Sequence, residues 1–191
     1  MTDNPVFAPG LFAGRHVLVT GGATGIGFGI ARELGGLGAR VTLASRDPAK
    51  LDDAVARLRT EGIAAARQVL NIRDAAAIEA LFATLAATGD LPDALINNAG
   101  GQFSAPALET SANGFRAILD LNLQGGFQMC RAYAAALVAQ GRRGHIVNIV
   151  FAHTGAMPDF AAAAAARAAM VNLTKTLALE WGRHGILVNA I

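Results

Sequence analysis

The segment TGGATGIG spans residues 20–27 and follows directly on the apolar run HVLVT at 16–20. Glycine is needed wherever a Cβ would block a tight turn or the approach of a phosphate group, and the N–H groups at a helix N-terminus attract phosphate oxygens. Gly21, Gly25 and Gly27 stand at the positions where a Cβ would interfere. A glycine-rich turn is weak evidence alone. Its place between the first strand and the first helix favours a dinucleotide-binding turn over a plain strand-to-helix turn.

The rest of the chain alternates short β-branched runs with longer helical patterns. Strands are predicted at 16–20, 41–45, 66–70, 93–98, 145–150 and 186–191. Strands that are apolar on both faces and joined by helix-length connections must run parallel and be covered by helices on both sides. The predicted fold class is therefore α/β, a doubly wound parallel sheet of the Rossmann type. Asp47-Pro48 is typical of a helix start and Gly62 of its end.

Length and composition favour one globular domain. The 191 residues are 53% hydrophobic and 16% charged and include 22 glycines, a balance typical of a large core with tight turns. We expect a single dinucleotide-binding domain over 1–191, with 1–13 as an N-terminal arm. The arm carries Phe7, Leu11 and Phe12 and leaves two alternatives open: it packs on the domain, or it is a frayed tail.

Charge and cysteine content argue against several classes of partner. The net charge is +2 and the basic residues are spread along the chain, which argues against nucleic acid. The single Cys130 has no disulfide partner and no Cys/His group has zinc-ligand spacing, so we expect a reduced, cytoplasmic setting and no metal. The N-terminus lacks signal-peptide regions, and the most apolar stretch, 160–166, is too short to cross a bilayer, so no membrane partner is expected.

Four motifs occur in order at the predicted strand ends: TGGATGIG at 20–27, NNAG at 97–100, Asn122 within LNLQGG, and GHIVNI at 144–149. In this combination the chain resembles the short-chain dehydrogenase/reductase family over essentially its whole length. The segments PGLFAGRHVLVTGGATGIG, NNAGGQF and AARAAMVNLTKTLALEW are similar to peroxisomal trans-2-enoyl-CoA reductases and to bacterial citronellol or citronellal dehydrogenases. The resemblance implies an oxidoreductase that uses a nicotinamide dinucleotide.

The resemblance also implies which residues meet the cofactor. Asn97, Ala99 and Gly100 are expected along the adenosine and ribose path. Asn71-Ile72, at the end of the third strand, are expected beside the adenine, although Asn71 stands where many relatives carry Asp. The full set predicted to bind the cofactor is Thr20, Gly21, Thr24, Gly25, Ile26, Gly27, Ser45, Arg46, Asn71, Ile72, Asn98, Ala99, Gly100 and Gly101.

The end of the second strand predicts the choice between NAD and NADP. An acidic residue there accepts hydrogen bonds from a free ribose 2′-OH, whereas an arginine pairs with a 2′-phosphate. The residues are Ser45 and Arg46, which favour NADP (NADPH). The alternative is that Arg46 is a solvated loop charge, and the neighbouring Asp47 weakens the case for phosphate binding.

The reaction site departs from the family pattern. Relatives use Ser, Tyr and Lys, the last two in a YxxxK motif on the helix after the fifth strand. Here the serine neighbourhood is Val150-Phe151, the tyrosine position is Ala163 and the lysine position is Arg167. Arg167 keeps a charge and a fork of N–H donors for the nicotinamide ribose, but it does not exchange protons. The only tyrosine, Tyr133, is interpreted as a packing residue.

Asn122, Arg167 and His153 are the predicted catalytic residues. Asn122 matches the family's active-site asparagine, and its alternative is a helix-interior amide bonded to backbone. His153 has a reference pKa of about 6.5, which suits proton delivery near neutrality, although a lone loop histidine is more often a surface residue. The other polar candidates are Gln102, Thr154 and Asp159.

Two functions stay open. The leading one is an NADP-dependent oxidoreductase that reduces an enoyl-CoA or a related unsaturated or carbonyl compound, such as a terpenoid. The alternative is a nucleotide-binding protein that has lost the Ser-Tyr-Lys chemistry, which Ala163 and Phe151 favour. The helices containing Cys130 and Met170 are apolar around much of their circumference, which suits either a homo-oligomer interface or burial within one domain.

The sequence stops at Ile191, inside the predicted sixth strand. Members of the family continue with a substrate lid and a last strand, so we expect a C-terminally truncated Rossmann domain without these parts. ILVNAI at 186–191 would then be an unpaired apolar edge, prone to association, in a protein of low turnover. The alternative is that a second subunit covers this edge.

Overall fold

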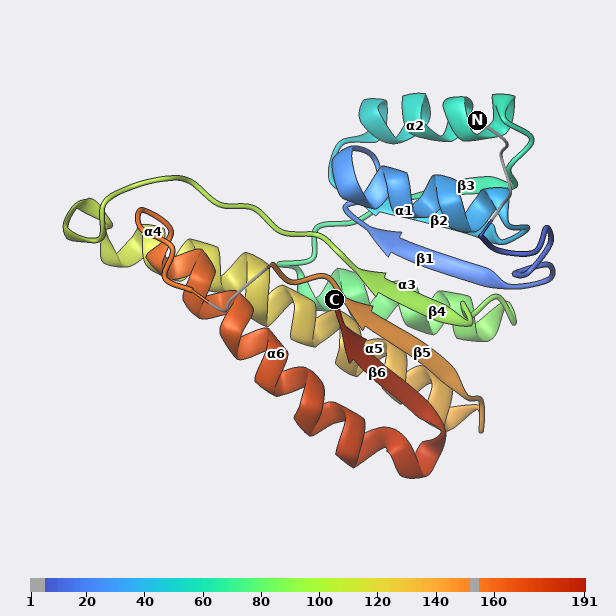
Figure 1. The fold of residues 1–191 in the computed structure, drawn as a ribbon. Coiled ribbons are helices and arrows are strands. Elements are labelled where there is room, and N and C mark those ends of the chain that lie inside the picture. Colours follow the sequence, from blue (N-terminus) through green and yellow to red (C-terminus); the bar gives the residue numbers. More distant parts are fainter. Residues whose placement is uncertain (1–5, 152–154) are drawn as a thin grey trace.

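A computed structural model describes residues 6–151 and 155–191. A six-stranded parallel sheet lies at its centre, in the order β3-β2-β1-β4-β5-β6 (Figure 1). The strands are β1 (His16–Thr20), β2 (Arg40–Ser45), β3 (Ala65–Val69), β4 (Ala94–Asn97), β5 (Gly144–Asn148) and β6 (Ile186–Ala190). The doubly wound parallel sheet predicted from the apolar runs is confirmed. β5 ends two residues earlier than predicted, at Asn148, which pairs with the last residue of β4, Asn97.

Helices cover both faces of the sheet, because the strands are apolar on both faces. The helices are α1 (Gly25–Gly36), α2 (Pro48–Thr60), α3 (Ala75–Ala87), α4 (Ala112–Leu119), α5 (Gly125–Ala139) and α6 (Ala161–Trp181), with short helical turns η1 (Ala107–Glu109), η2 (Asp120–Gln124) and η3 (Gly182–His184). α1 and α2 cover one face, and α3, α5 and α6 cover the other (Figure 1). Val19 and Leu51 belong to the first buried cluster, and Leu95 and Met129 to the second.

The second helix begins and ends at the predicted residues. The Asp47 carboxylate accepts hydrogen bonds from the backbone N–H groups of Ala49 at 3.0 Å and Lys50 at 3.2 Å, and Pro48 is the first helical residue. Gly62, just past the end of α2, has a φ of +79°, a left-handed conformation that glycine adopts without strain. Asp47 is therefore engaged in capping α2.

The N-terminal arm contacts the domain mainly at Phe12. The N–H of Phe12 donates to the carbonyl oxygen of Leu37 at 2.9 Å, and its ring packs against the cluster under α1 and α2. Phe7 and Leu11 are 57% and 52% exposed. Of the two alternatives for the arm, packing on the domain holds at Phe12, at the end that leads into β1.

Much of the apolar character of α5 and α6 is explained by burial within the domain. Tyr133 is fully buried, donates from its hydroxyl to the carbonyl oxygen of Pro92 at 2.9 Å and packs against Phe82, as expected of a packing residue. Cys130 and Met170 are also buried, and burial raises the pKa of the Cys130 thiol to about 12. A buried thiol of this kind stays protonated and unreactive.

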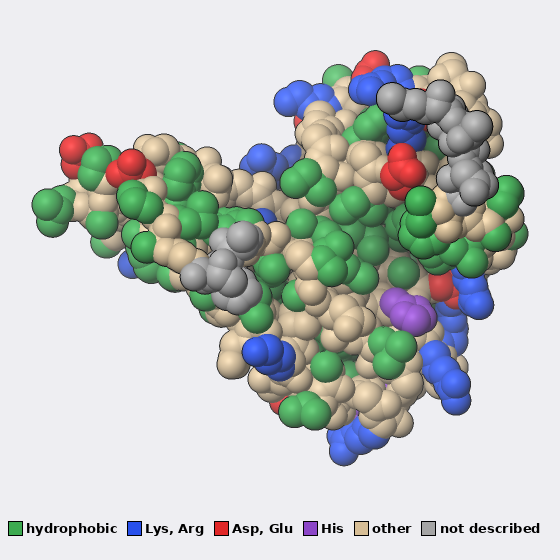
Figure 2. Space-filling view, viewed as in Figure 1, with side chains coloured by type: hydrophobic (Ala, Val, Ile, Leu, Met, Phe, Trp, Pro, Cys, Tyr) green, Lys and Arg blue, Asp and Glu red, His purple; other side chains and the backbone are tan. Residues whose placement is uncertain are grey.

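Apolar side chains are exposed on a projecting loop and along one edge of the sheet. The loop from β4 through η1 to α4 projects from the body of the molecule together with the start of α6, and hydrophobic side chains gather on this projection (Figures 1 and 2). On it, Leu108 is fully exposed and Phe103 is 47% exposed. The other surface is β6, one edge of the sheet, where Leu187 is 53% exposed. Within the described residues, no helix has the length and apolarity of a membrane span.

Candidate functional site

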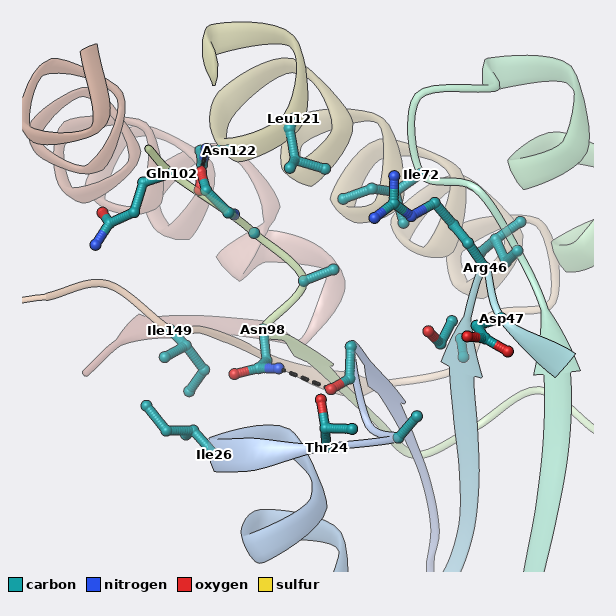
Figure 3. Close-up of a pocket in the computed structure, with 18 of the residues that line it drawn as sticks. Thr24, Ile26, Arg46, Asp47, Ile72, Asn98, Gln102, Leu121, Asn122 and Ile149 are labelled. Carbon is teal, nitrogen blue, oxygen red and sulfur yellow. Dashed lines mark hydrogen bonds between the residues drawn. The ribbon is translucent and has the colours of Figure 1, made fainter. Parts of the chain in front are cut away.

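The carboxyl ends of the parallel strands surround a cavity of about 790 Å³. It lies where the strand order reverses between β1 and β4, the place where doubly wound sheets bind ligands. Figure 3 shows side chains from the loops after β1, β2, β3, β4 and β5 around it. The predicted site residues that line the cavity are Gly21, Thr24, Ile26, Ser45, Arg46, Ile72, Asn98, Ala99, Gly100, Gly101, Gln102, Asn122 and Arg167.

The glycine turn after β1 forms a cradle that side chains would fill. Gly21 has a φ of +64°, and a Cβ added there would lie 2.8 Å from the Asn98 amide nitrogen. A Cβ on Gly27 would overlap the carbonyl oxygen of Gly21. The side chain of Thr24, the residue before α1, makes no capping hydrogen bond to the helix, so the N-terminus of α1 faces the cavity without a capping side chain. This cradle fits a pyrophosphate group.

Four residues of the predicted cofactor set do not line the cavity. The fully buried Thr20 hydroxyl accepts hydrogen bonds from the N–H groups of Asn98 at 3.0 Å and Ala99 at 2.9 Å, which ties the loop after β4 to the end of β1. Asn71 turns its side-chain oxygen to the N–H of Arg73 at 3.2 Å, a local turn bond. These four residues are Thr20, Gly25, Gly27 and Asn71, of which Thr20 and Gly27 contact residues of the lining.

The end of β2 brings two cations to one end of the cavity. Arg46 extends toward Ile72 while the Asp47 carboxylate points away from it (Figure 3). Arg46 makes no ion pair within the described part of the chain, and Asp47 is occupied with the cap of α2. Lys50, on the first turn of α2, also lines the cavity, with its Nζ 3.7 Å from an Asp47 oxygen. The sequence prediction missed Lys50, although its position four residues after Arg46 at a helix start was a usable signal.

Other lining residues that the sequence reasoning did not select are apolar. Backbone and apolar side chains line most ligand cavities, so their residue types carry no specific signal. The unselected lining residues, apart from Asp47 and Lys50, are Ala23, Ala44, Leu70, Leu121 and Ile149, with Val150 and Phe151 recognised only as the altered serine neighbourhood.

The side-chain amide of Asn122 makes its hydrogen bonds to backbone groups. It is buried within η2, a π-helical turn between α4 and α5. Its amide nitrogen donates to the carbonyl oxygens of Gly101 at 2.6 Å and Ile118 at 3.0 Å, and its side-chain oxygen accepts from the N–H of Gly101 at 3.2 Å. The backbone-bonded alternative therefore describes its contacts, and Asn122 holds the Gly100-Gly101 turn at the cavity wall.

Arg167 reaches the same end of the cavity from α6. Its Nη1 donates to the carbonyl oxygen of Ile149, just past β5, at 2.7 Å. A Cβ added to Gly100 would overlap the Nη2 of Arg167 and lie 2.6 Å from the Asn122 side-chain oxygen. Glycine at this position therefore leaves the space that the guanidinium occupies. Burial lowers the pKa of Arg167 from its ordinary value, and arginine nevertheless stays charged in proteins. Within the described residues, Arg167 has no carboxylate partner.

The tyrosine position of the family lies inside an apolar cluster. Ala163 is 3% exposed and packs with Ile118 and Ala162, and Phe151 and Phe160 pack against them. Ala163 does not line the cavity. Among the described residues at this end, Arg167 is the only charged side chain in the lining.

Of the remaining catalytic candidates that the structure describes, only Gln102 is found in the cavity lining. His153 and Thr154 lie outside the described residues. Asp159 has a φ of +66°, its carbonyl oxygen accepts from the N–H of Ala105 at 2.9 Å, and it does not line the cavity. Gln102 lines the cavity on the side of Asn122 (Figure 3).

A doubly wound sheet with a glycine cradle at its strand-order reversal defines a dinucleotide-binding protein. A family model described as "short chain dehydrogenase" matches residues 15–191. The chain belongs to the short-chain dehydrogenase/reductase family of NAD(P)-dependent oxidoreductases. The resemblance drawn from the four sequence motifs is thereby confirmed.

Relatives with several substrates match over nearly the whole chain. A peroxisomal 2,4-dienoyl-CoA reductase of Arabidopsis thaliana is 40% identical and aligns with 99% of this chain and 66% of its own length. A gluconate 5-dehydrogenase of Gluconobacter oxydans is 37% identical over 96% of this chain and 72% of its own. The solved structure of a citronellol catabolism dehydrogenase of Pseudomonas aeruginosa has a TM-score of 0.90 and 37% identity, over 97% of this chain and 76% of that one. The chain thus spans about two thirds to three quarters of these relatives.

Proposed function

We propose that this protein is an NADP-dependent reductase. The observation that carries the proposal is the pair Arg46 and Lys50 at the end of the cavity where the adenosine ribose of a dinucleotide would lie. Asp47, which weakens the case for phosphate binding, uses Oδ1 to cap α2 and turns Oδ2 toward Lys50, while Arg46 forms no ion pair within the described residues. An arginine free of a carboxylate partner favours a 2′-phosphate over a 2′-hydroxyl.

The bound dinucleotide would lie along the cavity with its pyrophosphate on the cradle at Gly21 and its nicotinamide near Arg167 and Gly100. When bound, NADPH supplies a hydride. The chain's own contribution is to hold the adenosine end of the dinucleotide with Arg46 and Lys50 and to line the nicotinamide end with the apolar Ile149, Val150 and Phe151.

We propose an α,β-unsaturated acyl thioester of coenzyme A, or a related unsaturated carbonyl compound, as the substrate class. Two observations support it: the site lacks the family's tyrosine at Ala163, and the relatives include a dienoyl-CoA reductase and a citronellol catabolism dehydrogenase. Reduction of a carbon–carbon double bond does not require a phenol that protonates an alkoxide. A purely nucleotide-binding role is the second candidate, favoured by the same buried Ala163 and by Phe151.

Turnover separates the two candidates. Purified protein is mixed with NADPH and, in turn, an enoyl-CoA, a terpenoid enal, an aldehyde and a ketone, and the loss of nicotinamide absorbance is recorded. NADPH binding with oxidation by the unsaturated compounds supports the reductase. NADPH binding without oxidation by any of the compounds supports the binding protein instead.

We also propose that the protein forms homo-oligomers. A groove between α5 and α6 is lined by apolar residues that include Val138, Trp181 and the 86% exposed Leu179, with Arg131, Glu180 and Arg183 beside them. An apolar groove beside such a side chain suits an interface with a second copy of the chain.

A further inference from the structure

The guanidinium of Arg167 is a fixed and unsatisfied positive charge at the reacting end of the cavity. One N–H is anchored on the carbonyl oxygen of Ile149, and the Nη2 side lies against Gly100. The other donors of the fork have no hydrogen-bond partner among the described residues. The side chain is partly buried, and a charge that has lost part of its hydration without gaining a counter-ion favours a negative group beside it in a working complex.

The surroundings of this charge make it effective. Ile149, Val150 and Phe151 form an apolar wall beside it, and an electrostatic interaction is stronger next to an apolar surface than in bulk water. The amide of Asn122 is committed to Gly101 and Ile118 and is not free to serve the same purpose. Of the described side chains at this end of the lining, Gln102 also carries an N–H donor, but Arg167 is the one that brings a positive charge to a developing oxyanion.

Arginine can hold an anion but cannot give up a proton at neutral pH. Hydride addition to a simple carbonyl produces a strongly basic alkoxide on the attacked carbon, which needs an acid beside it. Hydride addition to the β-carbon of an enoyl thioester instead produces an enolate, whose charge is spread onto the thioester oxygen. A fixed cation can hold this enolate until water protonates its α-carbon.

We propose that Arg167 donates hydrogen bonds to the enolate oxygen of an α,β-unsaturated thioester, and that it selects conjugate reduction over carbonyl reduction; this rests on the proposed reductase function. The hydride, which carries two electrons, forms a new C–H bond at the β-carbon, and the electrons of the carbon–carbon π bond move into the enolate. A proton from solvent then binds the α-carbon as the thioester carbonyl re-forms. The net reaction consumes one NADPH and one proton for each double bond.

An enolate can be observed without turnover. Acetoacetyl-CoA binds as its enolate where a cation stabilises that form, and the enolate has its own ultraviolet absorption band. With saturating NADP⁺, which has no hydride to give, the unaltered protein should raise this band, and Arg167→Gln should abolish the rise. Arg167→Lys, which keeps the charge without the fork, should show an intermediate band. Arg116→Gln, an exposed arginine of α4 outside the cavity, is the matched control and should behave like the unaltered protein.

Kinetics give a second readout. Removal of one oxyanion donor lowers kcat by about 100-fold, so Arg167→Gln should show this loss on an enoyl-CoA at saturating NADPH. The kcat of Arg167→Lys should fall at alkaline pH as its ammonium deprotonates, whereas the unaltered protein should show no such fall.

In D₂O the product should carry deuterium at the α-carbon. Circular dichroism confirms that each variant is folded.

The outcomes distinguish this inference from the proposed function. An equal enolate band in the unaltered protein and a folded Arg167→Gln variant, or no band in the unaltered protein, overturns the role of Arg167. If NADPH is oxidised by ketones but no enolate band forms, the reductase function stands and the Arg167 inference is wrong. If the enolate band depends on Arg167 but no unsaturated compound oxidises NADPH, the proposed role of Arg167 in binding the enolate is supported and the proposed reductase function is rejected.

Discussion

At the scale of single residues, function depends on which charges are already satisfied. Asp47 follows Arg46 directly in the sequence and looks like its counter-charge, yet its Oδ1 accepts from the first turn of α2 and its Oδ2 faces Lys50. Asn122 looks like a free catalytic amide, yet its bonds hold Gly101. Arg46 and Arg167 keep their charges available at opposite ends of the cavity.

Arg46→Ala is expected to weaken NADPH binding by about 1.5–3 kcal/mol, the usual contribution of hydrogen bonds to charged groups. Lys50→Ala should weaken it by a smaller amount, because Lys50 lacks the bidentate fork. NADH binding should be nearly unchanged in both variants, since NADH has no 2′-phosphate. Isothermal titration with both dinucleotides tests this. Equal losses for NADPH and NADH would contradict the assignment.

Ala163→Tyr is expected to destabilise the protein rather than restore a family active site. Ala163 is 3% exposed within the cluster that Phe151 and Phe160 cover, so a phenol there overpacks it, at a cost of about 1–3 kcal/mol. Urea unfolding measures the loss, and an assay with a ketone measures activity. A stable variant with strong new ketone reduction would show that the position opens into the cavity.

The stability of the protein should fall as the pH drops below the ordinary pKa of histidine, because of His16. The ring is buried in β1, with Nε2 2.8 Å from the Thr42 hydroxyl oxygen. Burial, and then the charge of Arg40, lower the pKa of His16 from 6.5, and they outweigh Asp90, which acts in the opposite direction. The unfolded chain therefore binds the proton more readily, so stability is full above 6.5 and declines as the pH falls toward the folded-state pKa. His16→Gln should flatten this decline in urea unfolding between neutral and mildly acidic pH; an unchanged decline would assign it to other groups.

At the scale of elements, the cradle depends on close contact between the turn after β1, the start of α1 and the loop after β4. Thr20 and Asn98 tie the first and third of these together by hydrogen bonds. Gly27 brings α1 against the carbonyl oxygen of Gly21 so closely that a Cβ has no space. The dinucleotide site is thus a property of three elements at once.

Gly27→Ala is expected to push α1 away from the turn and to abolish NADPH binding. Gly29→Ala, on the same helix, is the matched control: a Cβ there meets nothing within 4 Å, and alanine in a helix gains about 0.5–1 kcal/mol over glycine. Fluorescence titration with NADPH and thermal unfolding of both variants provide the comparison. Full binding by Gly27→Ala would show that the turn adapts to the added carbon.

At the scale of the whole molecule, the apolar groove between α5 and α6 predicts self-association. Leu179→Asp should shift the protein toward monomer in multi-angle light scattering, because it places a charge at the rim of the groove. Phe7→Ser, in the exposed part of the N-terminal arm, is the control and should leave the mass unchanged. A monomeric unaltered protein, or the same mass for Leu179→Asp, would reject this interface.

The parallel α/β sheet, the helix start at Asp47, the glycine turn and the family could all be predicted from the amino-acid sequence, because periodicity and turn chemistry are local properties that residue types encode. The contacts of each polar group could not be predicted in this way and required the folded structure. In the structure, Asp47 caps its own helix, and Lys50 lines the same end of the cavity as Arg46. The guanidinium of Arg167 packs against Gly100 and reaches the cavity. These contacts join residues from different strands and helices, and their packing depends on the whole fold rather than on spacing along the chain.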